Sequence, residues 1–201
     1  MRKNLCVLIL TIDINQINQN NQINNVNNIL PIVCHTVGSQ TMIETILELI
    51  LKLSPEKIIV YVNKYNIECI NKSLKHQSYS KLITFCVVDN ELDKNSRRLS
   101  YSKCLSGHIL VVPANCPLLK LSSLIKMSES KCNVKVNNNL FFIPKYSDSV
   151  NIVNEIDFLR PDSRNSFLQN NHFKVITISD IENLSIDNKS DYLKVKKLMN
   201  L

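Results

Sequence analysis

Glycine is nearly absent from this chain, which has two glycines and no tryptophan in 201 residues. No glycine precedes Gly38, so the first apolar segment, residues 4–10, is followed by residues that all carry side chains. A glycine-rich turn, in which the backbone itself approaches a phosphate group, is therefore excluded at that point. Gly38 lies instead in NILPIVCHTVGSQTMIETIL (residues 28–47), between a proline and the start of an amphipathic helical pattern.

Long hydrophobic runs are also missing. No stretch of 18 or more uncharged apolar residues occurs, so we expect no membrane-spanning helix and no membrane partner. The N-terminal segment MRKNLCVLILTID lacks a small-residue cleavage site, which favours a first buried strand over a signal peptide. The seven cysteines form no C-x-x-C pair and mostly lie in apolar runs, which indicates reduced thiols and a cytoplasmic location.

The chain carries a formal net charge of +7. Its basic residues are scattered, apart from the Arg97-Arg98 pair and the group Lys194, Lys196 and Lys197. No aromatic residues alternate with them, as they usually do in proteins that bind single-stranded nucleic acid by stacking. We therefore do not expect a nucleic-acid partner, whereas anionic small molecules such as nucleotides fit this positive balance.

Apolar runs of strand length alternate with helical patterns along the chain. The expected strands are residues 4–10, 57–62, 82–88, 108–114, 138–144 and 173–179, and the expected helices lie at 42–53, 67–74, 98–105, 117–127, 150–159 and 189–199. Strands that are apolar throughout are typical of a parallel sheet with helices on both faces. We predict one α/β domain over residues 1–201, Rossmann-like, with a mostly parallel central sheet.

Two segments lack such patterns. Residues 13–28 are rich in asparagine and glutamine and are interpreted as a low-complexity loop insert. The segment RPDSRNSFLQNNH (residues 160–172) is also predicted to be a loop. Ligands of open α/β sheets bind beyond the carboxyl ends of the strands. This rule directs attention to residues 10–13, 63–66, 89–91, 114–117 and 179–187.

Several segments, in order, resemble the sugar-1-phosphate nucleotidyltransferases. LPIVCHTVGSQTMIETIL (residues 30–47) is similar to the LPKVLHTVAGKPMIEHVL segment of the bacterial N-acetylglucosamine-1-phosphate uridylyltransferase domain. VVPANCPLL (residues 111–119) resembles the family pattern L-x-G-D-x-P-L, and VNNNLFFIP (residues 136–144) resembles I-N-T-G-I-Y-x-F. SIDNKSDYLKVKKLM (residues 185–199) is similar to the closing V-N-x-x-x-D-L helix.

This resemblance implies the reaction of UTP with a sugar 1-phosphate to give a UDP-sugar and pyrophosphate, with Mg²⁺ between the phosphates. The catalytic demand is to bring two anionic groups together, so cations and backbone N–H donors must offset the developing charge. The family supplies a glycine-rich turn, the lysine of its LPK motif and two metal ligands with oxygen donors.

The sequence departs from the family at several of these positions. Asp13 and its neighbours stand where the glycine turn is expected, and Ile32 replaces the lysine. Asn115 replaces the metal-binding aspartate, and the region of the second glycine motif, residues 89–98, has no glycine. The family's phosphate-binding chemistry is therefore largely missing.

Other positions match. Asp187 corresponds to the second metal-binding position, so the resemblance implies a metal site at Asp187 with Asn115 or Asp13. Asn137 corresponds to the sugar-binding asparagine, and the Arg97-Arg98 pair is the candidate phosphate contact. Each match has a structural alternative, because Asp187 could begin the turn before the last helix and Asn137 lies in an asparagine-rich stretch. His35 is retained, and on an apolar turn a packed histidine is the favoured interpretation over a catalytic one.

Two hypotheses of function follow. The first is a divergent uridylyltransferase that uses Mg²⁺ and makes UDP-N-acetylglucosamine or a similar sugar nucleotide. The second is a pseudoenzyme, a non-catalytic module that binds UTP, a UDP-sugar or another protein, as a homo-oligomer or paired with an active relative. Ile32 separates the two hypotheses, because an enzyme needs another cation in its place.

Overall fold

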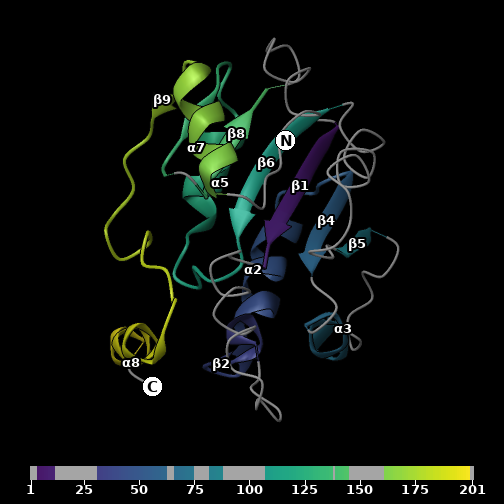
Figure 1. The fold of residues 1–201 in the computed structure, drawn as a ribbon, viewed down its shortest axis with the longest axis vertical. Helices are drawn as coiled ribbons and strands as arrows, with labels where there is room; N and C mark the ends of the chain where they lie inside the picture. Colours follow the sequence, from purple (N-terminus) through teal and green to yellow (C-terminus); the bar gives the residue numbers. More distant parts are fainter. Residues whose placement is uncertain are drawn as a thin grey trace.

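The computed structural model describes residues 4–11, 31–62, 66–74, 82–87, 107–137, 139–144 and 161–199. A seven-stranded sheet dominates this part of the chain, in the order β5-β4-β1-β6-β8-β7-β9 (Figure 1). Its strands are β1 (Leu5–Leu10), β4 (Lys57–Val62), β5 (Ile83–Val87), β6 (His108–Pro113), β7 (Val134–Lys135), β8 (Phe141–Ile143) and β9 (Lys174–Val175). The helices are η1 (Ile32–Cys34), α2 (Met42–Leu51), α3 (Ile67–Leu74), α5 (Leu121–Ser128), α7 (Pro161–Asn170) and α8 (Lys189–Leu198).

The centre of the sheet is parallel, as predicted. β1 pairs in parallel with β4 on one side and β6 on the other, and β4 pairs in parallel with β5. All six residues of β1 are buried, which explains why this strand is an uninterrupted apolar run. β8 runs antiparallel to β6 and is the one reversed strand among those of this sheet that the structure describes. The prediction of a mostly parallel sheet is confirmed.

The two faces of the sheet build separate apolar clusters. Leu5, Val7 and Ile9 of β1 point to a cluster that also contains residues of α2, α3 and α5. The alternate residues of β1 point to a second cluster, with Phe167 and Leu168 of α7. Because successive side chains of a strand face opposite sides, this division follows directly from the period of two. The prediction of helices on both faces is confirmed.

The stretch around Gly38 forms a small hairpin. β2 (Thr36–Val37) pairs antiparallel with β3 (Gln40–Thr41), and the chain turns through Gly38, which has a φ of 72°. This dihedral favours glycine at the first central position of a two-residue hairpin turn. Thr41 then caps α2, since its side chain accepts from the Glu44 N–H and the Glu44 carboxylate accepts from the Thr41 N–H. The glycine therefore shapes a turn between two strands.

Two sequence predictions are wrong. Residues 160–172, predicted as loop, contain α7, which shows little apolar periodicity and is held on the sheet by Phe167 and Leu168. Pro161 at its first position was the available signal. The strand predicted at 173–179 is limited to β9, because its partner β7 is only two residues long. Beyond β9 the chain leaves the sheet and runs to α8.

Other predicted elements can be placed as follows. The helix predicted at 117–127 begins later, at Leu121, after a turn that includes Pro117. The helices expected at 98–105 and 150–159 and the insert at 13–28 lie outside the described residues. Within the described part of the chain, every helix is too short or too polar to cross a membrane.

Candidate functional site

The carboxyl ends of β1 and β6 lie side by side. The Ala114 N–H, directly after β6, donates to the Leu10 carbonyl at the end of β1, at 2.9 Å. The next residue is Asn115, so the parallel pairing of these two strands fixes its position at this edge of the sheet. The prediction that residues 114–117 lie beyond a carboxyl end is therefore confirmed, and it agrees with where ligands bind in open α/β sheets.

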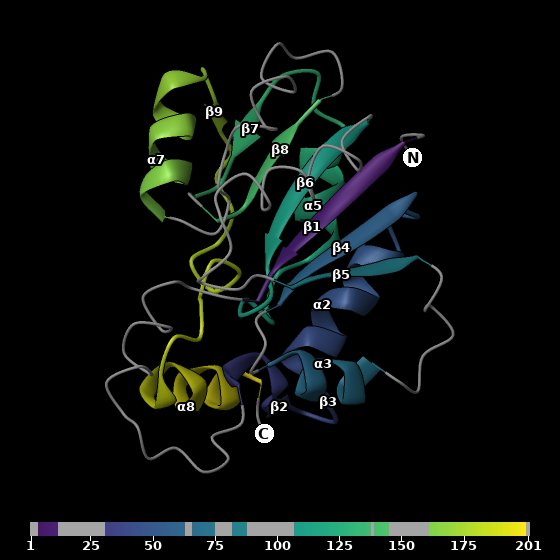
Figure 2. The same cartoon turned by 45° about the vertical axis from the view of Figure 1, so that its right-hand side comes forward.

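α8 packs against the β2–β3 hairpin at the same edge. Figures 1 and 2 show both beyond the arrowheads of β1 and β6. Val195 of α8 shares an apolar cluster with Val37 and Met42. The Tyr192 hydroxyl donates to the Thr36 carbonyl at 2.7 Å, and the Tyr192 ring meets His35 edge-on at 5.9 Å. This packing holds the residues that immediately precede α8.

Asp187 is placed by this docking next to Asn115. The Ile186 N–H donates to the Asn115 carbonyl at 2.9 Å, and the Ile186 side chain is buried in the cluster under α8. The Asn115 Nδ2 then donates to Asp187 Oδ1 at 2.7 Å, although 72 positions separate the two residues. The Ser185 hydroxyl donates to Asp187 Oδ2 at 2.8 Å. Asn115 and Asp187, the metal-binding candidates that the family resemblance implies, therefore contact each other.

The pair offers hard oxygen donors at an exposed position. Asp187 contributes a carboxylate, and Asn115 would contribute its amide oxygen after a rotation that exchanges its oxygen and nitrogen. Mg²⁺ is typically bound through one or two carboxylates and completed by substrate phosphates. No group of three or more His, Cys, Asp or Glu with metal-binding geometry occurs among the described residues. These two side chains would supply only part of a cation's ligands, and water or a phosphate would supply the rest.

The cysteine next to this pair is buried. Cys116 is buried, with 4% of its surface exposed. Burial, followed by the negative charge of Asp187, raises the pKa of the Cys116 thiol to about 12. The raised pKa keeps this thiol in its protonated form at neutral pH.

Asn137 lies in the loop that enters β8, and β8 begins opposite Val111 near the carboxyl end of β6. Its Oδ1 accepts from the N–H groups of Asn139 and Leu140, both at 2.8 Å. Its Nδ2 donates to Asn183 Oδ1 at 2.6 Å. Asn137 therefore contacts the same segment that carries Asp187, and its amide is engaged in shaping the loop.

The remaining candidate residues divide into two groups. Asp13, Arg97 and Arg98 lie outside the described residues. Ile32 packs its side chain against the helix-rich face cluster and the cluster under α8. The described part of this turn therefore supplies apolar packing where the family has a cation. His35 is half-buried against Tyr192, which agrees with the packed interpretation.

A buried carboxylate that the sequence did not single out anchors the segment before Asp187. Glu182 is 6% exposed, and it accepts hydrogen bonds from the hydroxyls of Ser123 at 2.6 Å and Ser179 at 3.3 Å. Lys120 lies 3.4 Å away across an ion pair. Burial alone would raise the pKa of Glu182, but these hydrogen bonds and the Lys120 charge lower it on balance. The ionised carboxylate ties residues 179–182 to the start of α5.

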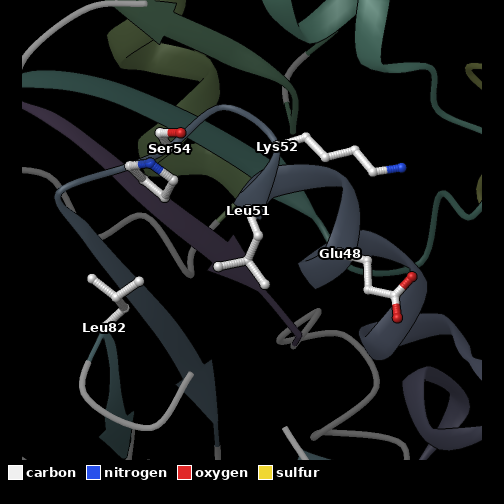
Figure 3. Close-up of a pocket in the computed structure, with 6 residues that line it drawn as sticks. Glu48, Leu51, Lys52, Ser54 and Leu82 are labelled. Carbon is white, nitrogen blue, oxygen red and sulfur yellow. The ribbon is translucent and has the colours of Figure 1, made fainter. Parts of the chain in front are cut away.

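A separate groove lies at the opposite edge of the sheet. It has a volume of about 560 Å³ and is lined by Glu48, Leu51, Lys52, Ser54, Pro55 and Leu82 (Figure 3). Figure 3 shows the Lys52 side chain extending away from Leu82. Residues 54 and 55 precede β4 and Leu82 precedes β5, so the groove flanks the amino ends of these strands. It is therefore remote from Asn115 and Asp187, which follow carboxyl ends.

Comparisons with known proteins agree with the fold. No protein-family model and no curated protein matches the chain in sequence. The structure is similar to 4-diphosphocytidyl-2C-methyl-D-erythritol synthase from Anaerococcus prevotii, with a TM-score of 0.63 and 13% identity over 99% of this chain and 97% of that one. It is similar to a nucleotidyl transferase from Methanothermobacter, with a TM-score of 0.65 and 12% identity over 99% of both chains.

A third similar structure is Rv0371c from Mycobacterium tuberculosis in complex with manganese. Its TM-score is 0.63 and its identity 8%, over 97% of this chain and 99% of that one. At 8 to 13% identity these similarities show the fold alone. The chain has a nucleotidyltransferase-like, Rossmann-like α/β fold.

Proposed function

We propose that this chain is a divergent uridylyltransferase, which binds UTP and N-acetylglucosamine 1-phosphate or a similar sugar phosphate at the carboxyl edge of its sheet. The observation that carries the proposal is the contact between Asn115 and Asp187, whose side chains meet at 2.7 Å across 72 positions. A turn residue that only began α8 would not need this partner, because Asn188 already caps the helix.

Asp187 and Asn115 would hold the divalent cation. Bound there, the cation would offset the charge that develops on the phosphates during transfer. Ser185 and the Ile186 N–H keep the Asp187 carboxylate and the Asn115 backbone in place. The manganese in the Rv0371c complex supports a role for a divalent metal in this fold.

Transfer by this site is expected to be slow. Ile32 supplies no charge to the phosphates, since its side chain packs in apolar clusters. Removing one group that stabilises transition-state charge typically lowers the rate by roughly 10²- to 10³-fold. In this proposal the chain retains one of the two metal-binding carboxylates, Asp187, and lacks the fixed cation of the family that it resembles.

The packing of Ile32 also favours a second candidate function, a non-catalytic module. In that case the fold binds a UDP-sugar and the bound nucleotide serves to recruit or regulate a partner. Binding of nucleotide is common to both candidates, and pyrophosphate release belongs to the first alone.

Incubation with UTP, Mg²⁺ and N-acetylglucosamine 1-phosphate should release pyrophosphate slowly, and an Asp187→Ala variant should release none above background. The Lys72→Ala variant is a matched control, because it removes an exposed charge on α3 that pairs only locally with Glu68. Pyrophosphate measured by a coupled enzyme assay decides the outcome. Equal release from wild type and Asp187→Ala would refute the enzyme. Calorimetric UTP binding without release would favour the binding module.

A further inference from the structure

Two cysteines from neighbouring elements, η1 and α3, lie in or against one apolar cluster, away from the Asn115–Asp187 pair. Cys34 ends η1 and is 3% exposed, within the cluster on the helix-rich face of the sheet. Cys69 lies in the first turn of α3, packs against that cluster and is partly exposed. η1 and α3 pack directly against each other, so the two cysteines lie on facing elements.

We propose that Cys34 and Cys69 form a redox modification site, at which a small disulfide such as oxidised glutathione converts the two thiols into one intramolecular disulfide. Both cysteines are free in the structure, and both belong to described segments that pack together. This site is separate from the proposed nucleotide site and does not depend on it.

The reaction takes two exchange steps. The Cys69 sulfur attacks one sulfur of the oxidant, whose disulfide bond breaks as a mixed disulfide forms and one small thiol leaves. The Cys34 sulfur then attacks the Cys69 sulfur, the mixed disulfide breaks, and the second small thiol leaves. The protein loses two electrons and two protons, and the oxidant takes up both as two thiols.

Exposure determines the order of these steps. Cys69 is partly exposed and can meet the oxidant, whereas Cys34 is buried and can be reached only from within. Burial, followed by the interactions with Cys69, raises the pKa of Cys34 well above its usual value. The second step is therefore slow at neutral pH and should accelerate as the pH rises, since the thiolate is the attacking form. Conversion of Cys69 to the mixed disulfide removes the contribution of its thiol to that shift.

The disulfide would join η1 to α3. η1 is followed directly by His35 and by the hairpin on which α8 docks. A covalent link here restricts the unfolded chain and fixes the start of the segment that supports α8. Oxidation should therefore raise the melting temperature, and a reductant should reverse the rise.

The exposed thiol Cys132 gives an internal comparison. It contacts Ser130, with the two side chains 3.5 Å apart. We expect oxidised glutathione to leave a mixed disulfide at Cys132, because its exposure permits the first step and its contact is with a serine hydroxyl rather than with a second thiol.

The test uses the folded full-length protein. It is treated with oxidised glutathione, its remaining thiols are alkylated, and a tryptic digest is analysed by mass spectrometry. Trypsin leaves Cys34 in peptide 4–52 and Cys69 in peptide 65–72, and the first of these also contains Cys6. The proposal predicts that these two peptides are joined, and that joining is lost in Cys34→Ala and in Cys69→Ala but kept in Cys6→Ala.

Three results would overturn the proposal. The two peptides could remain separate, with glutathione adducts on Cys69 alone. The link could persist in the Cys34→Ala variant, which would assign it to Cys6. It could also form to the same extent in urea-unfolded protein, which would show that the folded contact has no part in it. The Cys69→Ala variant separates loss of the link from any folding defect in Cys34→Ala, because Cys69 is partly exposed.

Discussion

The Asn115→Asp variant should be less stable than wild type in the absence of divalent cations and should regain its stability when Mg²⁺ or Mn²⁺ is added. The substitution puts a second carboxylate against Asp187, where the amide now donates at 2.7 Å. Two ionised carboxylates in contact repel, and at this exposed position the cost is about 1–2 kcal/mol. For a chain of this size the melting temperature should fall by on the order of 5 °C.

A cation bound between the two carboxylates reverses this effect. A ligand at about 100 times its dissociation constant stabilises the folded state by roughly 2.7 kcal/mol, so the variant should show a larger metal-induced rise in melting temperature than wild type. Thermal melts with chelator and with Mn²⁺ measure both changes. Asn183→Asp is the control, because it places a new carboxylate on the same segment but beside Asn137. A similar metal response in both variants would contradict a specific site.

Gly107→Ala should destabilise the fold more than any substitution in the proposed nucleotide site. A Cβ at Gly107 would lie 1.9 Å from the Asn4 carbonyl oxygen and 2.9 Å from its carbon, which are backbone atoms that cannot rotate away. The same oxygen accepts from the His108 N–H at 2.8 Å, so relief of the clash breaks the bond that aligns the starts of β1 and β6. Overpacking of this kind typically costs about 1–3 kcal/mol, and the lost hydrogen bond adds about 1 kcal/mol.

Urea unfolding measures this loss, and Gly38→Ala is the matched control. Gly38 has a φ of 72° but lies in an exposed hairpin turn, so its substitution adds dihedral strain of about 1 kcal/mol without a clash. We expect Gly107→Ala to lose at least twice as much free energy of unfolding as Gly38→Ala. Equal losses of free energy of unfolding would show that the close approach of Asn4 and Gly107 adds little to the cost of the substitution.

The central strands could be predicted because their burial leaves a strong signal. β1, β4 and β6 are buried on both faces, and such strands appear in the sequence as continuous apolar runs of the right length. α3 was predicted with its observed bounds for a related reason, since Ile70 and Leu74 repeat at helical spacing on its buried face. A local sequence pattern is therefore enough to predict a helix or strand when that element buries a regular set of its own apolar side chains.

Elements held by distant contacts could not be predicted in this way. α7 has Phe167 and Leu168 as buried apolar anchors, and its buried Arg164 donates to Asn139, in another part of the chain, at 2.8 Å. Neither contact leaves a periodic pattern in residues 160–172. The prediction of a strand over 173–179 was wrong for a different reason. An alternating apolar pattern forms a strand only beside a partner strand, and β7 provides only two residues.

The candidate site also combines residues that the sequence could indicate with contacts that it could not. The rule that ligands bind beyond carboxyl ends pointed to residues 114–117 and 179–187, and the family resemblance singled out Asn115 and Asp187 within them. Their contact depends on α8 docking through Tyr192 and Val195, which no spacing in the sequence reveals. Glu182 was missed because its role depends on a tertiary hydrogen bond from Ser123. Ser185 bonds Asp187 only two residues away, and its role follows from where Asp187 lies.

The most direct test of the account is the location of Mn²⁺ in a crystal soaked with MnCl₂ and UTP, measured by anomalous diffraction. Mn²⁺ replaces Mg²⁺ at oxygen-donor sites and gives an anomalous signal that identifies it. The account predicts a peak in coordination distance of the Asp187 carboxylate and the Asn115 side chain, with the triphosphate beyond the carboxyl ends of β1 and β6. Ordered nucleotide bound elsewhere, with the Asn115–Asp187 hydrogen bond intact and no peak beside it, would contradict the account.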